Sequence, residues 1–205
     1  MKILLLNGSP RPKGNTAAAL DEMEAVFAAE GLETERVQVG NRVIRGCIAC
    51  GKCAELGRCV FDDLVNELAP KLEACDGLVV GSPGVLRLGQ RHPGGPADPA
   101  VLLTPFDKTM KVGAAVAAAR RGGLSSTFDE LNKFFTISGM PVASSQYWNS
   151  IHGRLPGEAA QDAEGLQTMR TLARNMAFLV KSIALGREKY GLPEREEPLR
   201  THFIR

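Results

Sequence analysis

The sequence predicts an α/β domain built around a doubly wound parallel sheet. Three observations lead to this fold class: short, almost wholly apolar runs, helical periodicity between those runs, and loops containing Gly, Ser or Arg directly after them. Apolar runs such as residues 3–6 and 77–81 suit strands that helices cover on both faces. Strands that alternate with helices build a parallel sheet, in which a ligand lies beyond the carboxyl ends of the strands. The pattern therefore also predicts the edge of the sheet that carries a site.

Five strands and four helices are expected along the chain. The helix after the first strand has apolar positions three or four residues apart, and Gly31 ends it. Asp62 and Asp63 are expected to cap the helix that precedes the third strand. The expected strands are residues 2–6, 33–39, 77–81, 111–119 and 140–144, and the expected helices are residues 16–30, 64–74, 125–138 and 156–185.

Length and charge favour a single soluble domain. The 205 residues are 44% hydrophobic and 23% charged, with a formal net charge of +2. That balance argues against a nucleic-acid partner, and no apolar run approaches the roughly 20 residues that span a bilayer. The N-terminus enters a strand without the apolar segment of a secretion signal, so a cytoplasmic location is expected. We expect one domain over residues 1–185 and a C-terminal arm over residues 186–205, lying on the surface or on a neighbouring subunit.

The loop after the first strand, residues 7–16, has the character of an anion-binding site. A strand that breaks into such a loop and then enters a helix presents free backbone N–H groups and a positive dipole end. The loop is not a P-loop, because no G-K-[ST] closes it, and it lacks the G-x-G-x-x-G dinucleotide turn. The alternative is an ordinary strand–helix turn capped by Asn15 or Thr16. The side chains that would serve an anion are Ser9, Asn15 and Thr16 as donors, and Arg11 and Lys13 as charges.

Two further loops reach the same predicted edge of the sheet. One begins with Ser82-Pro83-Gly84 after the third strand, and the other is Ala119-Arg120-Arg121-Gly122-Gly123 after the fourth. Gly, Ser and Arg in these loops suit a phosphate-bearing ring system. The convergence of three such loops favours the anion-binding interpretation of the first.

Four of the five cysteines lie within thirteen residues. Cys47, Cys50, Cys53 and Cys59 have the spacing C-x2-C-x2-C-x5-C, which indicates metal or redox chemistry rather than a disulfide framework. Two-residue gaps let a loop fold around an iron–sulfur cubane, whereas a zinc site usually has two separated C-x2-C pairs. Three alternatives stay open: a [4Fe–4S] cluster, vestigial or redox-active thiols, and zinc. Cys75, at the far end of a helix, is expected in the core.

Three motifs and the cysteine spacing resemble one family of flavoproteins. G-S-P-R-x-x-G-N-T at residues 8–16, D-G-L-V-V-G-S-P at 76–83 and A-A-R-R-G-G at 118–123 resemble the flavodoxin-like NADPH-dependent FMN reductase superfamily. The cysteine segment, C-I-A-C-G-K-C-A-E-L-G-R-C-V-F-D-D, resembles its iron–sulfur flavoprotein branch. The resemblance implies a flavodoxin-like doubly wound sandwich with a five-stranded parallel sheet.

The resemblance also implies that FMN is bound without a covalent link. The phosphate would lie on the first loop, and the isoalloxazine ring would lie against the two later loops. The implied FMN-binding residues are Ser9, Arg11, Gly14, Asn15, Thr16, Pro83, Gly84, Val85, Ala119, Arg120, Arg121, Gly122 and Gly123, and the expected metal ligands are Cys47, Cys50, Cys53 and Cys59.

The activity implied is that of an FMN-dependent oxidoreductase, in a homodimer or homotetramer. Electrons would come from NADH or NADPH, or from ferredoxin through a cluster, and would pass to a small molecule or a protein. Reduction of a quinone or nitro compound would use the same site. The alternative of a different class is a non-enzymatic electron carrier or a thiol or cluster redox sensor. Residues 147–149 and His152 would suit closure of a flavin pocket, or they form an ordinary packed loop.

Residues 84–103 depart from the family pattern. Three prolines and two glycines in residues 93–99 exclude the crossover helix that should join the third and fourth strands. Codons for residues 84–102 read one base later allow V-Y-Y-A-S-A-N-G-T-L-V-A-L-L, which matches the flavin loop and helix expected at this place. We hypothesise a compensated frameshift confined to this stretch, either real or a sequencing error.

Overall fold

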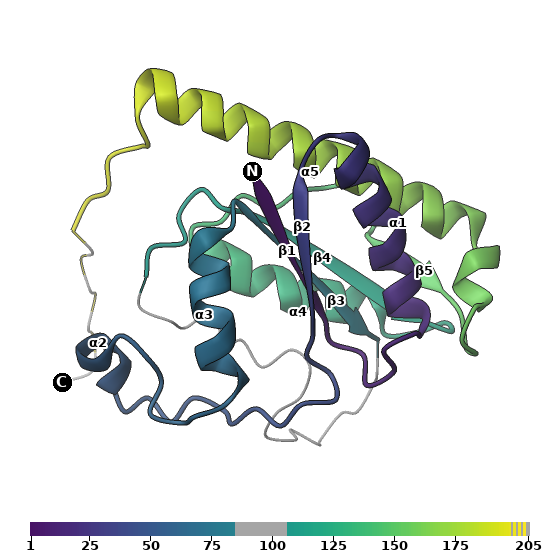
Figure 1. The fold of residues 1–205 in the computed structure, drawn as a ribbon, viewed down its shortest axis with the longest axis horizontal. Helices are drawn as coiled ribbons and strands as arrows, with labels where there is room; N and C mark the ends of the chain where they lie inside the picture. The colour runs from purple at the N-terminus through teal and green to yellow at the C-terminus, as the bar shows by residue number, and fades with distance from the viewer. Residues whose placement is uncertain (85–105, 198, 200, 202, 204–205) are drawn as a thin grey trace.

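A five-stranded, wholly parallel sheet forms the centre of the protein, in the strand order β2-β1-β3-β4-β5 (Figure 1). The computed structural model describes residues 1–84, 106–197, 199, 201 and 203. This sheet confirms the predicted fold class. The strands are β1 (Lys2–Asn7), β2 (Glu33–Gln38), β3 (Gly77–Pro83), β4 (Val112–Ala119) and β5 (Ser150–His152).

Helices cover both faces of this sheet. Figure 1 shows α1 and α5 together over one face, and α3 and α4 over the other. Within the described residues no helix is both long and apolar enough to cross a membrane. The helices are α1 (Asn15–Ala29), α2 (Lys52–Leu56), α3 (Leu64–Ala74), α4 (Leu124–Ile137) and α5 (Ala163–Tyr190), with a short 3-10 helix, η2 (Glu158–Gln161), before α5.

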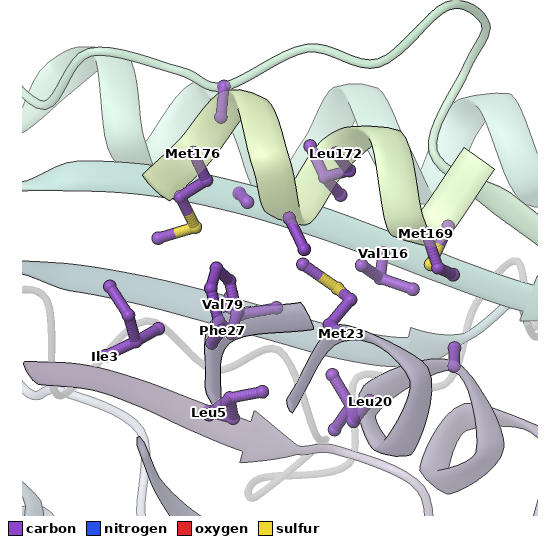
Figure 2. Close-up of a cluster of buried hydrophobic side chains, with 14 of the residues drawn as sticks. Ile3, Leu5, Leu20, Met23, Phe27, Val79, Val116, Met169, Leu172 and Met176 are labelled. Atoms are coloured by element: carbon purple, nitrogen blue, oxygen red, sulfur yellow. The ribbon is translucent and has the colours of Figure 1, made fainter. Parts of the chain in front are cut away.

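Alternation along the strands divides the apolar side chains between two cores. Ile3 and Leu5 of β1 point towards α1 and α5, whereas Leu4 and Leu6 point towards α3. Figure 2 shows the first core, in which Met23 and Phe27 of α1 lie between the sheet and α5. The second core fills the space between the sheet, α3 and α4. Because both of their faces are buried, the central strands β1, β3 and β4 are nearly continuous apolar runs, as predicted.

The fifth strand differs from the prediction. Residues 140–144 do not form a strand, because their pairing with β4 stops after one bridge, between Val142 and Gly113. The chain then leaves the sheet and returns at β5, which pairs with the other end of β4. The edge strand is therefore three residues long and lies ten residues after the predicted one begins.

The last helix also differs from its predicted limits. Asp162 caps α5 by accepting a 2.9 Å hydrogen bond from the backbone N–H of Gly165, so the regular helix begins at Ala163 rather than near residue 156. The helix then continues to Tyr190, five residues past the predicted end. A short helix, α2, lies in the cysteine segment, which was predicted as a loop. Of the anomalous stretch 84–103, all but Gly84 lies outside the described residues.

Candidate functional site

The loop from β1 to α1 is held by hydrogen bonds at its start. The backbone N–H of Gly8 donates to the carbonyl of Gly81 in β3 at 2.8 Å, which joins the loop to the neighbouring strand. The N–H of Ser9 donates to Oδ1 of Asn7 at 3.1 Å, and the hydroxyl of Ser9 accepts from the N–H of Arg11 at 3.2 Å. Ser9 is buried by this arrangement. The loop is therefore a folded turn with internal order.

The end of β2 packs tightly against the same loop. Nε2 of Gln38 donates to the carbonyl of Ser9 at 2.5 Å. A Cβ at Gly40 would lie 2.3 Å from the carbonyl oxygen of Gly8 and from the carbonyl carbon of Ser9, so only glycine fits there. Gln38 and Gly40 were not singled out from the sequence. A glycine one or two residues after a strand is the signal that points to such a close approach.

The start of α1 is open to an anion. Gly14 is the N-cap residue, no side chain among the described residues caps it, and no acidic residue lies in the first turn. The interpretation of this loop as a turn capped by Asn15 or Thr16 is therefore wrong. The backbone N–H groups of the first helical turn keep their capacity to bind an anion, and the helix dipole favours negative charge there.

The side chains at the start of α1 differ in their surroundings. Thr16 is buried, and its methyl group would lie 2.9 Å from a Cβ at Gly81, so the helix and β3 approach closely. Oδ1 of Asn15 accepts a 3.2 Å hydrogen bond from the backbone N–H of Ala159. Arg11 is exposed beside them. Nδ2 of the buried Asn7 has no hydrogen-bond partner within the described part of the chain, which leaves a spare donor next to this loop.

The loops after β3 and β4 meet. The N–H of Gly84 donates to the carbonyl of Ala118 at 2.7 Å. A Cβ at Gly84 would lie 3.2 Å from Cβ of Ala119 and 3.3 Å from the backbone of Gly123, so the two predicted loops are in contact. Arg120, Arg121 and Gly122 are exposed at this junction, and Val85 lies outside the described residues. The three loops predicted to bind FMN thus all lie at the carboxyl edge of the adjacent strands β1, β3 and β4.

The donor chemistry at this edge fits a phosphate-bearing flavin. Open amides of α1, the hydroxyls of Ser9 and Thr16 and the charge of Arg11 suit a phosphate, and the glycines of the later loops leave backbone accessible to a planar ring.

A fourth segment reaches this edge from β5. The N–H of Gly153 donates to the carbonyl of Ala119 at 3.1 Å. Oδ2 of Asp162 accepts from the backbone N–H of His152 at 2.7 Å and lies 3.3 Å from its Nδ1. A cavity of about 230 Å³ beside them is lined by Tyr147, Ser150, His152, Asp162, Glu164, Gly165 and Thr168.

The residues expected to close a pocket lie on this side. Tyr147 and Trp148 are exposed with their ring centroids 5.0 Å apart, whereas Asn149 is buried. Their closing role stays a prediction.

The cysteine segment is anchored at its two ends. The N–H of Arg45 donates to Oδ2 of Asp63 at 3.0 Å. Asn66 of α3 holds Cys59 by accepting from its N–H at 2.8 Å and donating to its carbonyl at 3.2 Å. Positive φ angles at Ala49, Gly51 and Gly57 bend the chain between these anchors.

The four predicted metal ligands are accessible but are not gathered. Cys47 and Cys50 are exposed, and Cys53 and Cys59 are half-buried. Among the described residues, no three His, Cys, Asp or Glu side chains are arranged to hold a metal ion. The donor set of four thiols still fits an iron–sulfur cluster, around which the segment would have to fold. Cys75 is buried as predicted, and burial raises the pKa of its thiol to about 11.

Known proteins resemble this chain in sequence and in fold. The family described as NADPH-dependent FMN reductase matches residues 1–85. An iron–sulfur flavoprotein of Methanocaldococcus jannaschii is 34% identical over 89% of this chain and 99% of its own length. An iron–sulfur flavoprotein of Methanosarcina thermophila is 31% identical over 92% of this chain and 100% of its own length.

Solved structures share the fold at low identity. RosB, determined with bound 8-demethyl-8-formylriboflavin-5′-phosphate, superposes with a TM-score of 0.65 at 18% identity, covering 100% of this chain and 94% of that one. A flavodoxin of Streptococcus pneumonia TIGR4 superposes with a TM-score of 0.57 at 12% identity, covering 86% and 97%.

Proposed function

Because the chain belongs to the iron–sulfur flavoprotein branch of the NADPH-dependent FMN reductase superfamily, we propose that it is an FMN-dependent oxidoreductase of the cytoplasm. The observation that supports the proposal is that the β1, β3 and β4 loops follow adjacent strands at one edge of the sheet, with the uncapped start of α1 at the end of the first loop. In the strand order 2-1-3-4-5 the switch point lies between β1 and β3, where a ligand of this fold binds.

The first loop binds the FMN phosphate in this proposal. Backbone N–H groups of the first turn of α1 and the hydroxyls of Ser9 and Thr16 donate to phosphate oxygens. Arg11 supplies a charge from the exposed side. Nothing in the first turn of α1 repels an anion, since no acidic residue lies there.

The later loops hold the isoalloxazine ring. FMN supplies the redox chemistry when bound, while the protein supplies binding, orientation and charge. Pro83 and Gly84, together with the adjoining backbone of residues 119–123, would form one surface against which the ring lies. Arg120 or Arg121, both exposed in the loop after β4, is the proposed group that stabilises negative charge developing on the reduced ring.

Cys47, Cys50, Cys53 and Cys59 are the proposed ligands of a [4Fe–4S] cluster. Their segment follows β2, whose end packs on the first loop, so both begin at the same edge of the sheet. We assign NADH, NADPH or ferredoxin as the electron donor and a small molecule or protein as the acceptor, in a homodimer or homotetramer.

Anaerobic purification tests these assignments. We expect stoichiometric FMN in the spectrum and reduction of that FMN by NADPH or NADH. A cluster adds broad absorption near 400 nm, together with iron and sulfide. Cys50→Ser should remove iron and sulfide and leave FMN bound, with Cys75→Ala as the control that removes a thiol outside the segment. Protein that takes up no FMN from solution would overturn the proposal.

A non-enzymatic electron carrier is the second candidate. The observation that favours it is the accessibility of the cysteine segment. Cys47 and Cys50 are exposed, so a partner protein could approach them. Reduction by ferredoxin that is fast, with no turnover from NADPH or NADH, would favour the carrier over the reductase.

A further inference from the structure

Residues 153–162, named here the η2 segment, join β5 to α5 and pack against the start of α1. We infer that the η2 segment orients the Asn15 carboxamide towards the phosphate of FMN, and thereby sets how strongly the protein prefers FMN to riboflavin. The inference rests on the proposed FMN site. It adds to that site a supporting segment, residues 153–162, that no sequence motif identified.

A single hydrogen bond decides which end of the Asn15 carboxamide remains able to donate. The backbone N–H of Ala159 is a donor, so it must be accepted by Oδ1 of Asn15, at 3.2 Å. With Oδ1 held in this way, the Nδ2 group keeps its N–H donors for another partner. A phosphate accepts hydrogen bonds and is repelled by an oxygen, so this orientation favours a phosphate and the reverse orientation disfavours it.

Gly153 packs closely against the Nδ2 end of the same carboxamide. A Cβ at Gly153 would lie 2.5 Å from Nδ2 and 2.7 Å from Cγ of Asn15. Gly153 has no positive φ that demands glycine, so the close approach of Asn15 is what favours glycine here, with the backbone nitrogen of Ala159 next nearest at 3.0 Å. The N–H of Gly153 is in turn fixed to the carbonyl of Ala119 at the end of β4.

The η2 segment is itself rigidly held. Oε2 of Glu158 accepts from the N–H groups of Arg154 at 2.6 Å and Leu155 at 3.1 Å, which closes the turn before η2. These two hydrogen bonds hold the pKa of the Glu158 carboxyl below its ordinary value. Ala159 is fully buried, and Asp162 ties the segment to both β5 and α5. The segment can therefore act as a fixed support for Asn15.

The two flavins separate this role from a general effect on folding. Riboflavin has the same ring and ribityl chain as FMN but no phosphate, so a change confined to the phosphate end alters the affinity for FMN alone. Dissociation constants for both are measured by quenching of flavin fluorescence, on full-length protein freed of bound flavin.

Gly153→Ala is the direct test, because its Cβ displaces the Asn15 carboxamide. We expect the affinity for FMN to fall about tenfold or more, the range of a charge-assisted hydrogen bond, with the affinity for riboflavin unchanged. The matched control is Gly186→Ala in α5, where nothing lies within 4 Å of the added Cβ. Equal weakening of both flavins by Gly153→Ala would overturn the inference.

Two Asn15 variants test whether the effect passes through that residue. Asn15→Asp keeps an acceptor for the Ala159 N–H but replaces Nδ2 with a charged oxygen, so FMN binding should weaken more than in Gly153→Ala. In an Asn15→Ala background, Gly153→Ala should cost no further FMN affinity. A further loss there would show that Gly153 acts by another route.

A second route keeps the inference testable if Gly153→Ala does not fold. Glu158→Gln weakens the acceptor that closes the turn, and we expect a roughly threefold fall in the ratio of FMN to riboflavin affinity. An unchanged ratio contradicts the inference. Wild-type protein that binds riboflavin and FMN equally would also overturn it, whereas wild-type protein that binds neither would overturn the proposed function itself.

Discussion

Residues 7–16, named here the phosphate-site loop for their proposed role, and the cysteine segment, residues 47–63, begin at the same edge of the sheet. They differ in how far along the chain their hydrogen-bond partners lie. The first is fixed by partners far away in sequence: the carbonyl of Gly81, the side chain of Gln38 and the N–H of Ala159. The second is anchored, within the described part of the chain, by Arg45, which bonds Asp63 18 positions away, and by Cys59, which bonds Asn66 seven positions away. Between them, the hydrogen bonds recorded for residues 46–58 join positions at most four apart.

The difference indicates which of the two proposed sites is preorganised in the absence of its ligand. A loop fixed by the surrounding fold loses little entropy when an anion binds, so its affinity comes from preorganised donors. A segment of exposed thiols with local contacts has to be ordered by whatever it binds, and that binding energy becomes local folding energy.

Gly40→Ala should damage the phosphate-site loop most. The added Cβ would lie 2.3 Å from backbone atoms of Gly8 and Ser9, so the loop must move. We expect FMN affinity to fall about 100-fold, with a loss of roughly 1–3 kcal/mol in the free energy of unfolding, typical of overpacking. Flavin titration and urea unfolding measure the two effects. Unchanged FMN binding would mean that the loop does not need the packing described here.

Limited proteolysis should separate the two regions by about tenfold or more in rate. Trypsin should cut after Lys52 and Arg58 in the cysteine segment much faster than after Lys13 in the phosphate-site loop, although all three are exposed. Mass spectrometry of timed digests measures the rates. Anaerobic iron–sulfide reconstitution should slow only the first two cuts. If trypsin cut after Lys13 as fast as after Lys52 and Arg58, the two regions would not differ in local stability as described.

Asp63→Ala should loosen one anchor of the cysteine segment at moderate cost. Asp63 caps α3 by accepting from the N–H of Val65 at 3.0 Å and accepts from the N–H of Arg45 at 3.0 Å. We expect a loss of about 1–2 kcal/mol in the free energy of unfolding and an unchanged affinity for FMN. The neighbouring, exposed Asp62 provides the control, since Asp62→Ala should cost much less.

Glu35→Gln should have the smallest effect, and one that depends on pH. Lys2, at 2.7 Å, and Lys71 hold the pKa of the Glu35 carboxyl below its ordinary value of 4.5. A carboxyl whose pKa is lower in the folded state stabilises above the unfolded pKa and loses this contribution as the pH falls through the folded pKa. We therefore expect a loss of about 0.5 kcal/mol at pH 7 that shrinks below about pH 4, measured by urea unfolding at each pH. Glu33→Gln, more exposed and 3.6 Å from Lys2, should cost less.

Strands β1, β3 and β4 could be predicted because burial on both faces makes each a run of apolar residues. Strand β2, a partly exposed edge strand, could be predicted from its alternation. The fifth could not, because β5 has three residues and only Ile151 is buried, which leaves no periodicity to detect. The stretch that was predicted instead, residues 140–144, makes a single bridge to Gly113. The local sequence pattern cannot distinguish a segment that forms a strand from one that makes a single β-bridge.

The candidate site follows the same rule. Its three loops could be predicted from their residues, because each follows a strand directly. Its supports could not, since Gln38 lies 29 positions from Ser9, and Ala159 lies 144 positions from Asn15. These pairs come together only when the chain folds, so no local sequence pattern identifies them. The four cysteines are not gathered in this structure, and their role as ligands of a cluster stays a prediction.

Residues 84–103 are open to a direct chemical check. Under a sequencing error, the tryptic peptide of residues 92–108 should be absent from a digest of protein isolated from its source. Its presence, established by tandem mass spectrometry, would refute the error and leave a frameshift fixed in the gene.

The hydrogen bond from Ala159 to Asn15 also sets an order of events during synthesis. The ribosome releases the first loop early, but the segment that supports it emerges about 140 residues later. Until α5 is made, Met23 and Phe27 of α1 lack the part of their packing that α5 provides, and the nascent chain presents an apolar surface that attracts chaperones. Stable cofactor loading therefore belongs to the finished polypeptide, and a chain truncated before β5 should aggregate rather than bind flavin.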